Sequence, residues 1–222
     1  MTETATQTSN TTRKHPPKKS RAKLIWTVVV VVVVAYVALG TKVVSDDDPL
    51  TEGTVQFNAE EFGAEKFPEV QEAVIDNALE APELASEISD DQSAAEEQHS
   101  EESSGGPVFS VTLTGTVGEG SSGIYEVDVD DVSDDLNIRV QTGPAINGTE
   151  LRDATGLMSF GEFSNQIEFQ NAAAALNDEM KDQVLSEVDT DDLEGETVTV
   201  TGAFTLINPE AWLVTPVELE VQ

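Results

Sequence analysis

The clearest pattern in the chain is an apolar run, Leu24–Gly40, in which seventeen consecutive residues carry no charge. Seven valines follow one another from Val28 to Val34. As a helix the run would measure roughly 26 Å, close to the hydrocarbon core of about 30 Å in a typical bilayer. Trp26 and Tyr36 lie near its two ends, where amphipathic rings favour the membrane interface. The pattern therefore predicts a transmembrane helix at 24–40.

Charges on either side of this run predict its orientation. Residues 1–23 contain six Lys and Arg residues, and Asp46–Asp48 follow the run. The positive-inside rule places 1–23 in the cytoplasm as a disordered basic tail, and everything after an acidic stalk, 41–56, outside the cell membrane. Ala38-Leu39-Gly40 also has the small–x–small form that signal peptidase accepts. The length of the apolar run favours a retained single-pass signal anchor, and cleavage stays open.

Helical signals follow in residues 57–102. Asn58 and Glu61 have the spacing of a capping box, and Phe57 and Phe62 that of a hydrophobic staple. We expect Gly63 to keep this first turn short. Prolines suit the first turn of a helix, so Pro68 and Pro82 predict the starts of a second and a third helix.

From Val108 the apolar positions recur with a period of two. This alternation predicts three strands, within 108–117, 125–130 and 136–141. A long connection, 142–195, should contain two helices, the first capped by Ser164 and the second by Asn177. Two more strands are expected at 197–207 and 212–221. The predicted fold is α+β: a five-stranded OB-like β-barrel domain at 107–222, with a helical insertion between strands 3 and 4.

Composition excludes several classes of function. The formal net charge is −32, divided between +5 in residues 1–23 and −37 in the rest. Such an acidic extracytoplasmic part repels polyanions, so we expect no nucleic-acid partner; a solvated surface is favoured over weak cation binding. The chain has no cysteine and only two histidines. Cysteine-based chemistry is therefore excluded, and we expect no catalytic residue, metal site or cofactor, and no enzyme.

One candidate site is the loop 141–153, which contains the turn pairs Gly143-Pro144 and Asn147-Gly148. Arg152 offers a planar fork of donors to a carboxylate or a hydroxyl-rich ligand, with Thr149 and Asp153 as neighbours. The favoured alternative is structural: Arg152 pairs with Asp153 or caps carbonyl groups and so holds the loop.

A second candidate lies in residues 160–169. Phe160, Phe163 and Phe169 are expected to plug the open end of the barrel, and a stacking platform is less favoured. Asn165 and Gln166 could hydrogen-bond a polar ligand, but helix capping and loop pinning are favoured for them. The ligand-binding candidates are therefore Arg152, Asp153, Asn165, Gln166 and Thr149.

These segments are similar to a bacterial family of predicted periplasmic lipoproteins, domain of unknown function 2291. The matching residues are Gln141-Thr142-Gly143-Pro144, Gly148-Thr149, Leu151-Arg152-Asp153-Ala154, Phe160, Phe163, Asn165-Gln166-Ile167-Glu168, Leu176-Asn177, Gly202-Ala203-Phe204 and Thr215-Pro216-Val217-Glu218-Leu219.

The resemblance extends from about Lys42 to the end, and it implies no catalytic residues, because the family has no established activity. Its members tend to be encoded beside ABC sugar-uptake systems of the ribose type, which implies an accessory role.

The chain departs from this family at one position. A lipobox cysteine usually precedes a Lys-Val-Val-like segment, but here Thr41 precedes Lys42-Val43-Val44. Threonine cannot carry a thioether-linked lipid, so we expect the transmembrane helix to replace the lipid as the anchor.

Three functions remain open. The first is a non-enzymatic, membrane-anchored extracytoplasmic accessory of an ABC sugar transporter, acting by protein contact. The second is direct binding of a small ligand, such as a sugar, a nucleoside or a cation, at the Arg152 loop. The third is a structural envelope protein. The partner, the ligand, the oligomeric state and the packing of 57–102 on the barrel stay open.

Overall fold

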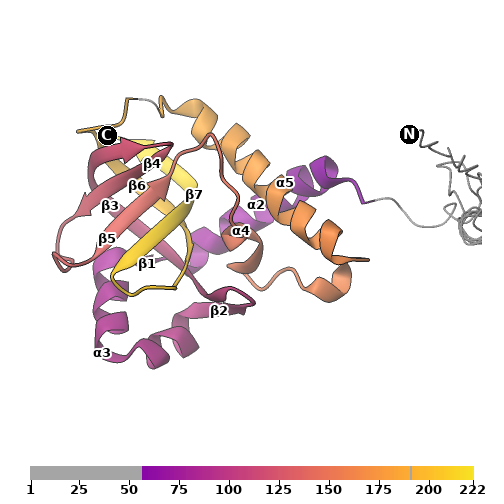
Figure 1. Ribbon diagram of the computed structural model, residues 1–222, viewed down its shortest axis with the longest axis horizontal. Coiled ribbons are helices and arrows are strands. Elements are labelled where there is room, and N and C mark those ends of the chain that lie inside the picture. Colours follow the sequence, from indigo (N-terminus) through magenta and orange to yellow (C-terminus); the bar gives the residue numbers. More distant parts are fainter. Residues whose placement is uncertain (1–56, 191) are drawn as a thin grey trace, which may run out of the picture. The chain divides into compact units, whose positions relative to one another are not determined.

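The computed structural model describes residues 57–190 and 192–222 (Figure 1). The predicted cytoplasmic tail, transmembrane helix and stalk, residues 1–56, lie outside the described residues. Among the residues that are described, no helix is both long enough and apolar enough to cross a membrane. Residue contacts group the described residues into one compact unit.

Helix α2, Ala59–Asn77, begins as the capping pattern predicts. The Asn58 side chain accepts a hydrogen bond from the Glu61 N–H, and the Phe57 and Phe62 rings lie 5.3 Å apart. The predicted break is wrong, however, because α2 continues through both Gly63 and Pro68. Burial on either side of the proline, by Phe67, Val70 and Val74, offsets the loss of one helical hydrogen bond.

Helix α3, Ala81–His99, has Pro82 in its first turn, as predicted. Its polar second half stays helical beyond a kink at Asp91, where φ is −153° and ψ is 89°. Asp91 Oδ1 accepts the N–H of Ala94 at 3.2 Å, so the side chain caps the part of the helix after the kink.

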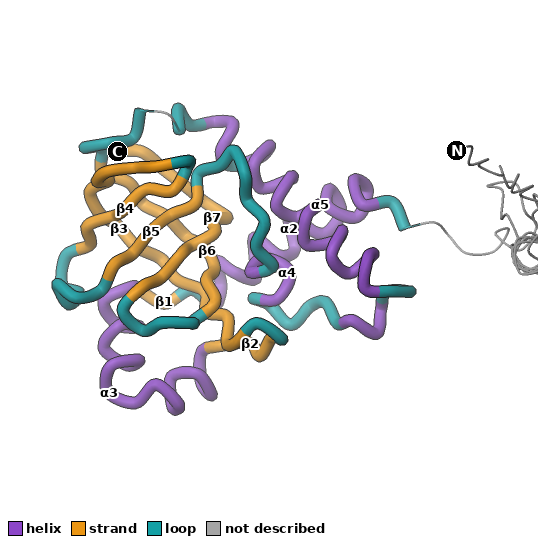
Figure 2. The backbone as a smooth tube through the Cα atoms, viewed as in Figure 1, coloured by secondary structure: helices purple, strands orange, loops and turns teal. Residues whose placement is uncertain are grey.

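Five strands form a circuit of pairings that returns to its start (Figure 2). They pair in the order β3-β4-β5-β7-β6, and β6 pairs again with β3. The β5–β7 pair is parallel and the other pairs are antiparallel. These are the five predicted strands, and the α+β class is confirmed. Their bounds are Gly106–Ser121 (β3), Ile124–Val129 (β4), Asn137–Gln141 (β5), Thr197–Thr205 (β6) and Ala211–Val221 (β7).

The described part of the chain has seven strands rather than the predicted five. β1, Leu79–Glu80, runs parallel to β3, and β2, Ser100–Ser103, runs antiparallel to it. Both are too short to show an alternating pattern in the sequence. They give hydrogen-bond partners to the first half of β3, which would otherwise leave a strand edge unpaired on that side.

The long connection between β5 and β6 contains one long helix, where two were predicted. This helix, α5, extends over Gln166–Gln183 and is capped by Asn165 rather than Ser164. Asn177 is not an N-cap, because it lies buried inside α5. The remaining elements of the connection are α4 (Glu150–Asp153) and the 3-10 turns η1 (Phe160–Glu162) and η2 (Leu185–Glu187).

The helices and the sheet share one core. α2 contacts β3, β6, β7 and α5, and α3 contacts β3. The rings of Phe109, Phe204 and Trp212 stack within this core, with centroid distances of 5.7 and 4.5 Å. Because helices cover one face of the first half of β3, Val108–Val111 are buried on both faces of the strand.

Candidate functional site

The candidate loop leaves the sheet at a tightly packed turn. Gln141 Nε2 donates to Thr215 Oγ1 at 2.8 Å, and the Thr142 N–H donates to the Gly123 carbonyl at 2.8 Å. Gly143 has a φ of +92°, and a Cβ added at Gly123 would collide with the Gly143 carbonyl. Both glycines are therefore needed for this close approach of two backbones.

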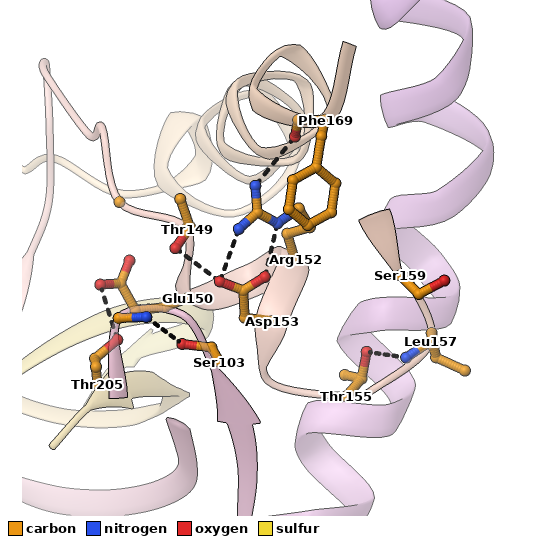
Figure 3. Close-up of polar contacts among 12 residues, drawn as sticks. Ser103, Thr149, Glu150, Arg152, Asp153, Thr155, Leu157, Ser159, Phe169 and Thr205 are labelled. Atoms are coloured by element: carbon orange, nitrogen blue, oxygen red, sulfur yellow. Dashed lines mark hydrogen bonds and ion pairs between the residues drawn. The ribbon is translucent and has the colours of Figure 1, made fainter. Parts of the chain in front are cut away.

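Arg152, on α4, is the centre of a buried polar network (Figure 3). Its Nε and Nη2 donate to the two carboxylate oxygens of Asp153 at 2.7 and 2.8 Å. Thr149 Oγ1 donates to Asp153 Oδ2 at 2.8 Å. The side chains of Arg152 and Asp153 are only 4% and 8% exposed, so this is a two-pronged ion pair withdrawn from water.

The same guanidinium also ties the loop to α5. Arg152 Nη1 donates to the Phe169 carbonyl at 3.1 Å, and the guanidinium carbon lies 3.5 Å from the centre of the Phe169 ring. Figure 3 shows the ring beside the guanidinium. Arg152 therefore joins α4 to α5 through a hydrogen bond and a cation–π contact.

These contacts are those of the structural alternative for Arg152. A ligand would have to displace a carboxylate or a carbonyl to reach the guanidinium. Ligand binding by Arg152, Asp153 and Thr149 stays a prediction.

Asn165 and Gln166 begin α5. Asn165 Oδ1 accepts the N–H groups of Ile167 and Glu168 at 2.9 and 3.0 Å, and Glu168 Oε2 accepts the Ser164 N–H at 2.9 Å. Gln166 is exposed in the first turn. Thus the fold brings Thr149, Arg152 and Asp153 together, whereas no hydrogen bond within the described residues joins Asn165 or Gln166 to that network.

Two further residues support the loop. Asn177, 2% exposed on α5, donates through Nδ2 to the Gly148 carbonyl at 2.9 Å. Glu150 Oε1 accepts from Thr205 Oγ1 at 3.5 Å, while Glu150 Oε2 is buried without a partner among the described residues. The sequence did not predict either role, because both depend on contacts between distant segments. The sequence pattern at Asn177 predicted an N-cap for a second helix, which the structure does not have.

Five phenylalanines form what we call the aromatic cluster, where the starts of α2 and α5 meet η1. Neighbouring ring centroids lie 5.2–5.8 Å apart. The expectation that three of them plug a barrel end is wrong, because none belongs to the buried core. Phe160 is 53% exposed. The cluster consists of Phe57, Phe62, Phe160, Phe163 and Phe169.

Acidic side chains accompany the aromatic cluster. Glu61, Glu162 and Glu168 each accept a hydrogen bond from their own helix start, from Asn58, Ser159 and Ser164 respectively. Lys66 is nearby: a hydrogen bond to Glu69 is the largest cause of its raised pKa, and the charge of Glu162 adds to it. The segments that supply the cluster thus also supply several carboxylates, and we call Glu61, Glu162 and Glu168 its acidic rim.

Among residues 57–190 and 192–222, no group of three or more His, Cys, Asp and Glu side chains could hold a metal ion.

Comparisons with known proteins give three further findings. An OB-fold protein from Thermotoga maritima, whose crystal structure is solved, superimposes with a TM-score of 0.60 at 18% identity, covering 75% of this chain and 99% of that one. This likeness shows the fold alone. No curated protein matches the chain. The family model described as predicted periplasmic lipoprotein (DUF2291) matches residues 29–220, which is most of the sequence. The chain therefore belongs to this family.

Proposed function

We propose that this chain is a non-enzymatic, membrane-anchored extracytoplasmic module that acts by protein contact, as an accessory of an ABC-type sugar uptake system. The family description supports the extracytoplasmic, membrane-associated part of the proposal. The observation that carries protein contact is the aromatic cluster, in which Phe160 is exposed and the other four rings are half-buried, together with its acidic rim.

Three of the six exposed large hydrophobic side chains among the described residues lie in this region. Phe160 is 53% exposed, Leu157 is 49% exposed and Ile167 is 70% exposed, all within eleven residues of sequence around η1. Large apolar side chains that gather on a surface mark contact sites, and aromatic residues are enriched at the centres of protein interfaces. A partner that covers Phe160 would bury apolar area that folding leaves in water.

The rim indicates the chemistry of that partner. Glu61, Glu162 and Glu168 lie in the same segments as the cluster phenylalanines. A fitting partner surface therefore combines apolar side chains with Lys and Arg. The transporter assignment rests on the family resemblance, since the proteins of this family tend to be encoded beside ABC sugar-uptake systems.

The anchor belongs to the same proposal. The apolar run 24–40 has the length of a single membrane span, and the chain contains no cysteine for lipid attachment. A retained helix with the N-terminus in the cytoplasm would hold the module beside a membrane-embedded permease.

Crosslinking in intact cells tests the proposal. The full-length chain is crosslinked gently, purified, and the proteins recovered with it are identified; sugar uptake is measured in a deletion strain. We expect a permease or its binding protein among the partners and a change in uptake on deletion. Failure of both results contradicts the transporter role, and recovery of wall proteins instead favours a structural envelope function.

A further inference from the structure

A small polar cavity lies where the ends of α2 and α3 meet β2 and β3. Its volume is about 140 Å³, and its polar lining consists of Asn77, Gln98, His99, Ser100, Glu101 and Ser110. Since one water needs roughly 10–15 Å³ of such space, the cavity has room for several waters or one small organic molecule. It shares no residue with the aromatic cluster or with the Arg152 network.

Ser110 is the buried polar residue of the cavity lining. The residue lies on β3, in the stretch buried on both faces, and is only 3% exposed. Its Oγ has no hydrogen-bond partner among the described residues. A buried hydroxyl without a partner is unfavourable, because it loses its bonds to water and gains none in return. Ser110 is one of the residues that line the cavity.

The other lining groups divide into those already engaged and those still available. Gln98 Nε2 donates to the Ala94 carbonyl, Ser100 Oγ donates to the Glu96 carbonyl, and His99 Nε2 pairs with Glu87.

Within the described part of the chain, the side chains of Asn77 and Glu101 make no hydrogen bond or ion pair. The available groups are thus an amide, a carboxylate and a hydroxyl, and together they both donate and accept.

This set of groups selects one ligand chemistry. An anion is disfavoured by Glu101 and by a chain with a net charge of −32. A divalent cation is disfavoured because no cluster of three metal-ligating side chains is found among the described residues. Hydroxyl groups of a neutral polyol both donate and accept, and so match Ser110, Asn77 and Glu101 together.

We propose that this cavity is a binding site for a small neutral polyhydroxyl compound, between glycerol and a pentose in size. A ligand hydroxyl bonds to Ser110 Oγ, and neighbouring hydroxyls bond to the Asn77 amide and the Glu101 carboxylate. The site is independent of the protein contact proposed above, so either can fail without the other.

Titration of the purified full-length protein tests this site. Glycerol, erythritol, xylitol and D-ribose are added separately, binding is followed by calorimetry, and backbone amide shifts identify the site. We expect saturable binding of at least one of them, with shifts centred on Asn77, Glu101 and Ser110. Inorganic phosphate and calcium chloride are the charged comparison probes, and we expect neither to bind here.

Ser110→Ala is the decisive variant. It removes a hydroxyl that lacks a protein partner, so the apo protein should fold with unchanged or higher stability, while the affinity for the polyol should fall roughly tenfold. Glu101→Gln keeps an acceptor and should retain binding. Ser89→Ala, on α3 outside this cavity, is the matched control and should bind as the unaltered chain does.

Three results would overturn the site. One is the absence of saturable binding of all four polyols, with only an ordered water found on Ser110 in a crystal. Another is binding that Ser110→Ala leaves unchanged. The third is binding of phosphate or calcium alone with amide shifts at this cavity.

Discussion

At the scale of single residues, the Arg152–Asp153 pair is the most consequential contact of the candidate loop. Both side chains are buried, and the arginine also contacts the carbonyl and the ring of Phe169 on α5. Two segments seventeen residues apart in sequence are thereby joined by one side chain. Stability of the loop, rather than ligand capture, is what these contacts most directly explain.

Arg152→Ala should lower the free energy of unfolding by about 3–5 kcal/mol, because it leaves the Asp153 carboxylate buried without its partner. Urea denaturation followed by circular dichroism measures the loss. Lys66→Ala is the matched control: it removes an ion pair with Glu69 whose side chains are 35% and 55% exposed, and should cost no more than about 1 kcal/mol. Equal losses in the two variants would mean that Arg152 does not hold the loop.

Part of this network could be predicted from sequence. Adjacent opposite charges at 152 and 153, in a chain with few arginines, made their pairing the favoured interpretation. The contacts of Phe169 with Arg152, and of Asn177 with Gly148, could not be predicted, since each depends on where α5 lies against the loop.

At the scale of elements, the helix starts show how precisely a local sequence pattern can locate the N-cap of a helix. Asn58 caps α2 as its pattern indicates, whereas the N-cap of α5 lies one residue later than expected, at Asn165 instead of Ser164. Both residue types are good caps, so composition alone could not choose between neighbours. Asn177 failed as a cap because the buried alanines around it continue the helix against α2.

Asn165→Ala should destabilise the protein by about 0.5–2 kcal/mol, because two N–H groups of the first turn of α5 lose their acceptor. Thermal or urea unfolding measures the change. Ser164→Ala keeps the backbone N–H that bonds Glu168 and is the adjacent control, expected to be near neutral. A larger loss for Ser164→Ala than for Asn165→Ala would contradict the observed helix start.

Gly63 explains why α2 and α5 approach so closely. A Cβ added at this position would lie 2.8 Å from the Ala175 carbonyl oxygen, a backbone atom that cannot rotate away. The sequence suggested a helix break at Gly63; the residue instead lies within α2, where it permits helix contact.

Gly63→Ala should therefore destabilise the fold by about 1–3 kcal/mol, even though alanine is the better helix former. Urea denaturation shows whether the free energy of unfolding falls or rises. Gly161→Ala is the control, because its nearest neighbour would be Ser159 Oγ at 3.9 Å, and we expect a change within about 0.5 kcal/mol. Stabilisation by Gly63→Ala would show that the two helices are less tightly packed than described.

At the scale of the whole described unit, the order of strands and helices was the most predictable property. Alternating apolar positions identified β3 to β7, and the helix between the third and fourth of them matched the OB arrangement. The circuit of pairings depends on contacts between strands that are far apart in the sequence. β1 has only two residues, which is too short for any periodic pattern. The aromatic cluster was missed as one feature because its rings come from three separate segments.

In the proposed function, the aromatic cluster contacts a partner protein. The most direct measurement places a photo-crosslinking amino acid at Phe160 of the full-length chain in intact cells, with the same substitution at Ile207 as the control. Ile207 is 84% exposed and lies between β6 and β7, away from the cluster in sequence. We predict that position 160 captures a defined partner with a basic, apolar-centred surface and that position 207 captures none. Equal capture at both positions, or none at 160, would contradict the account.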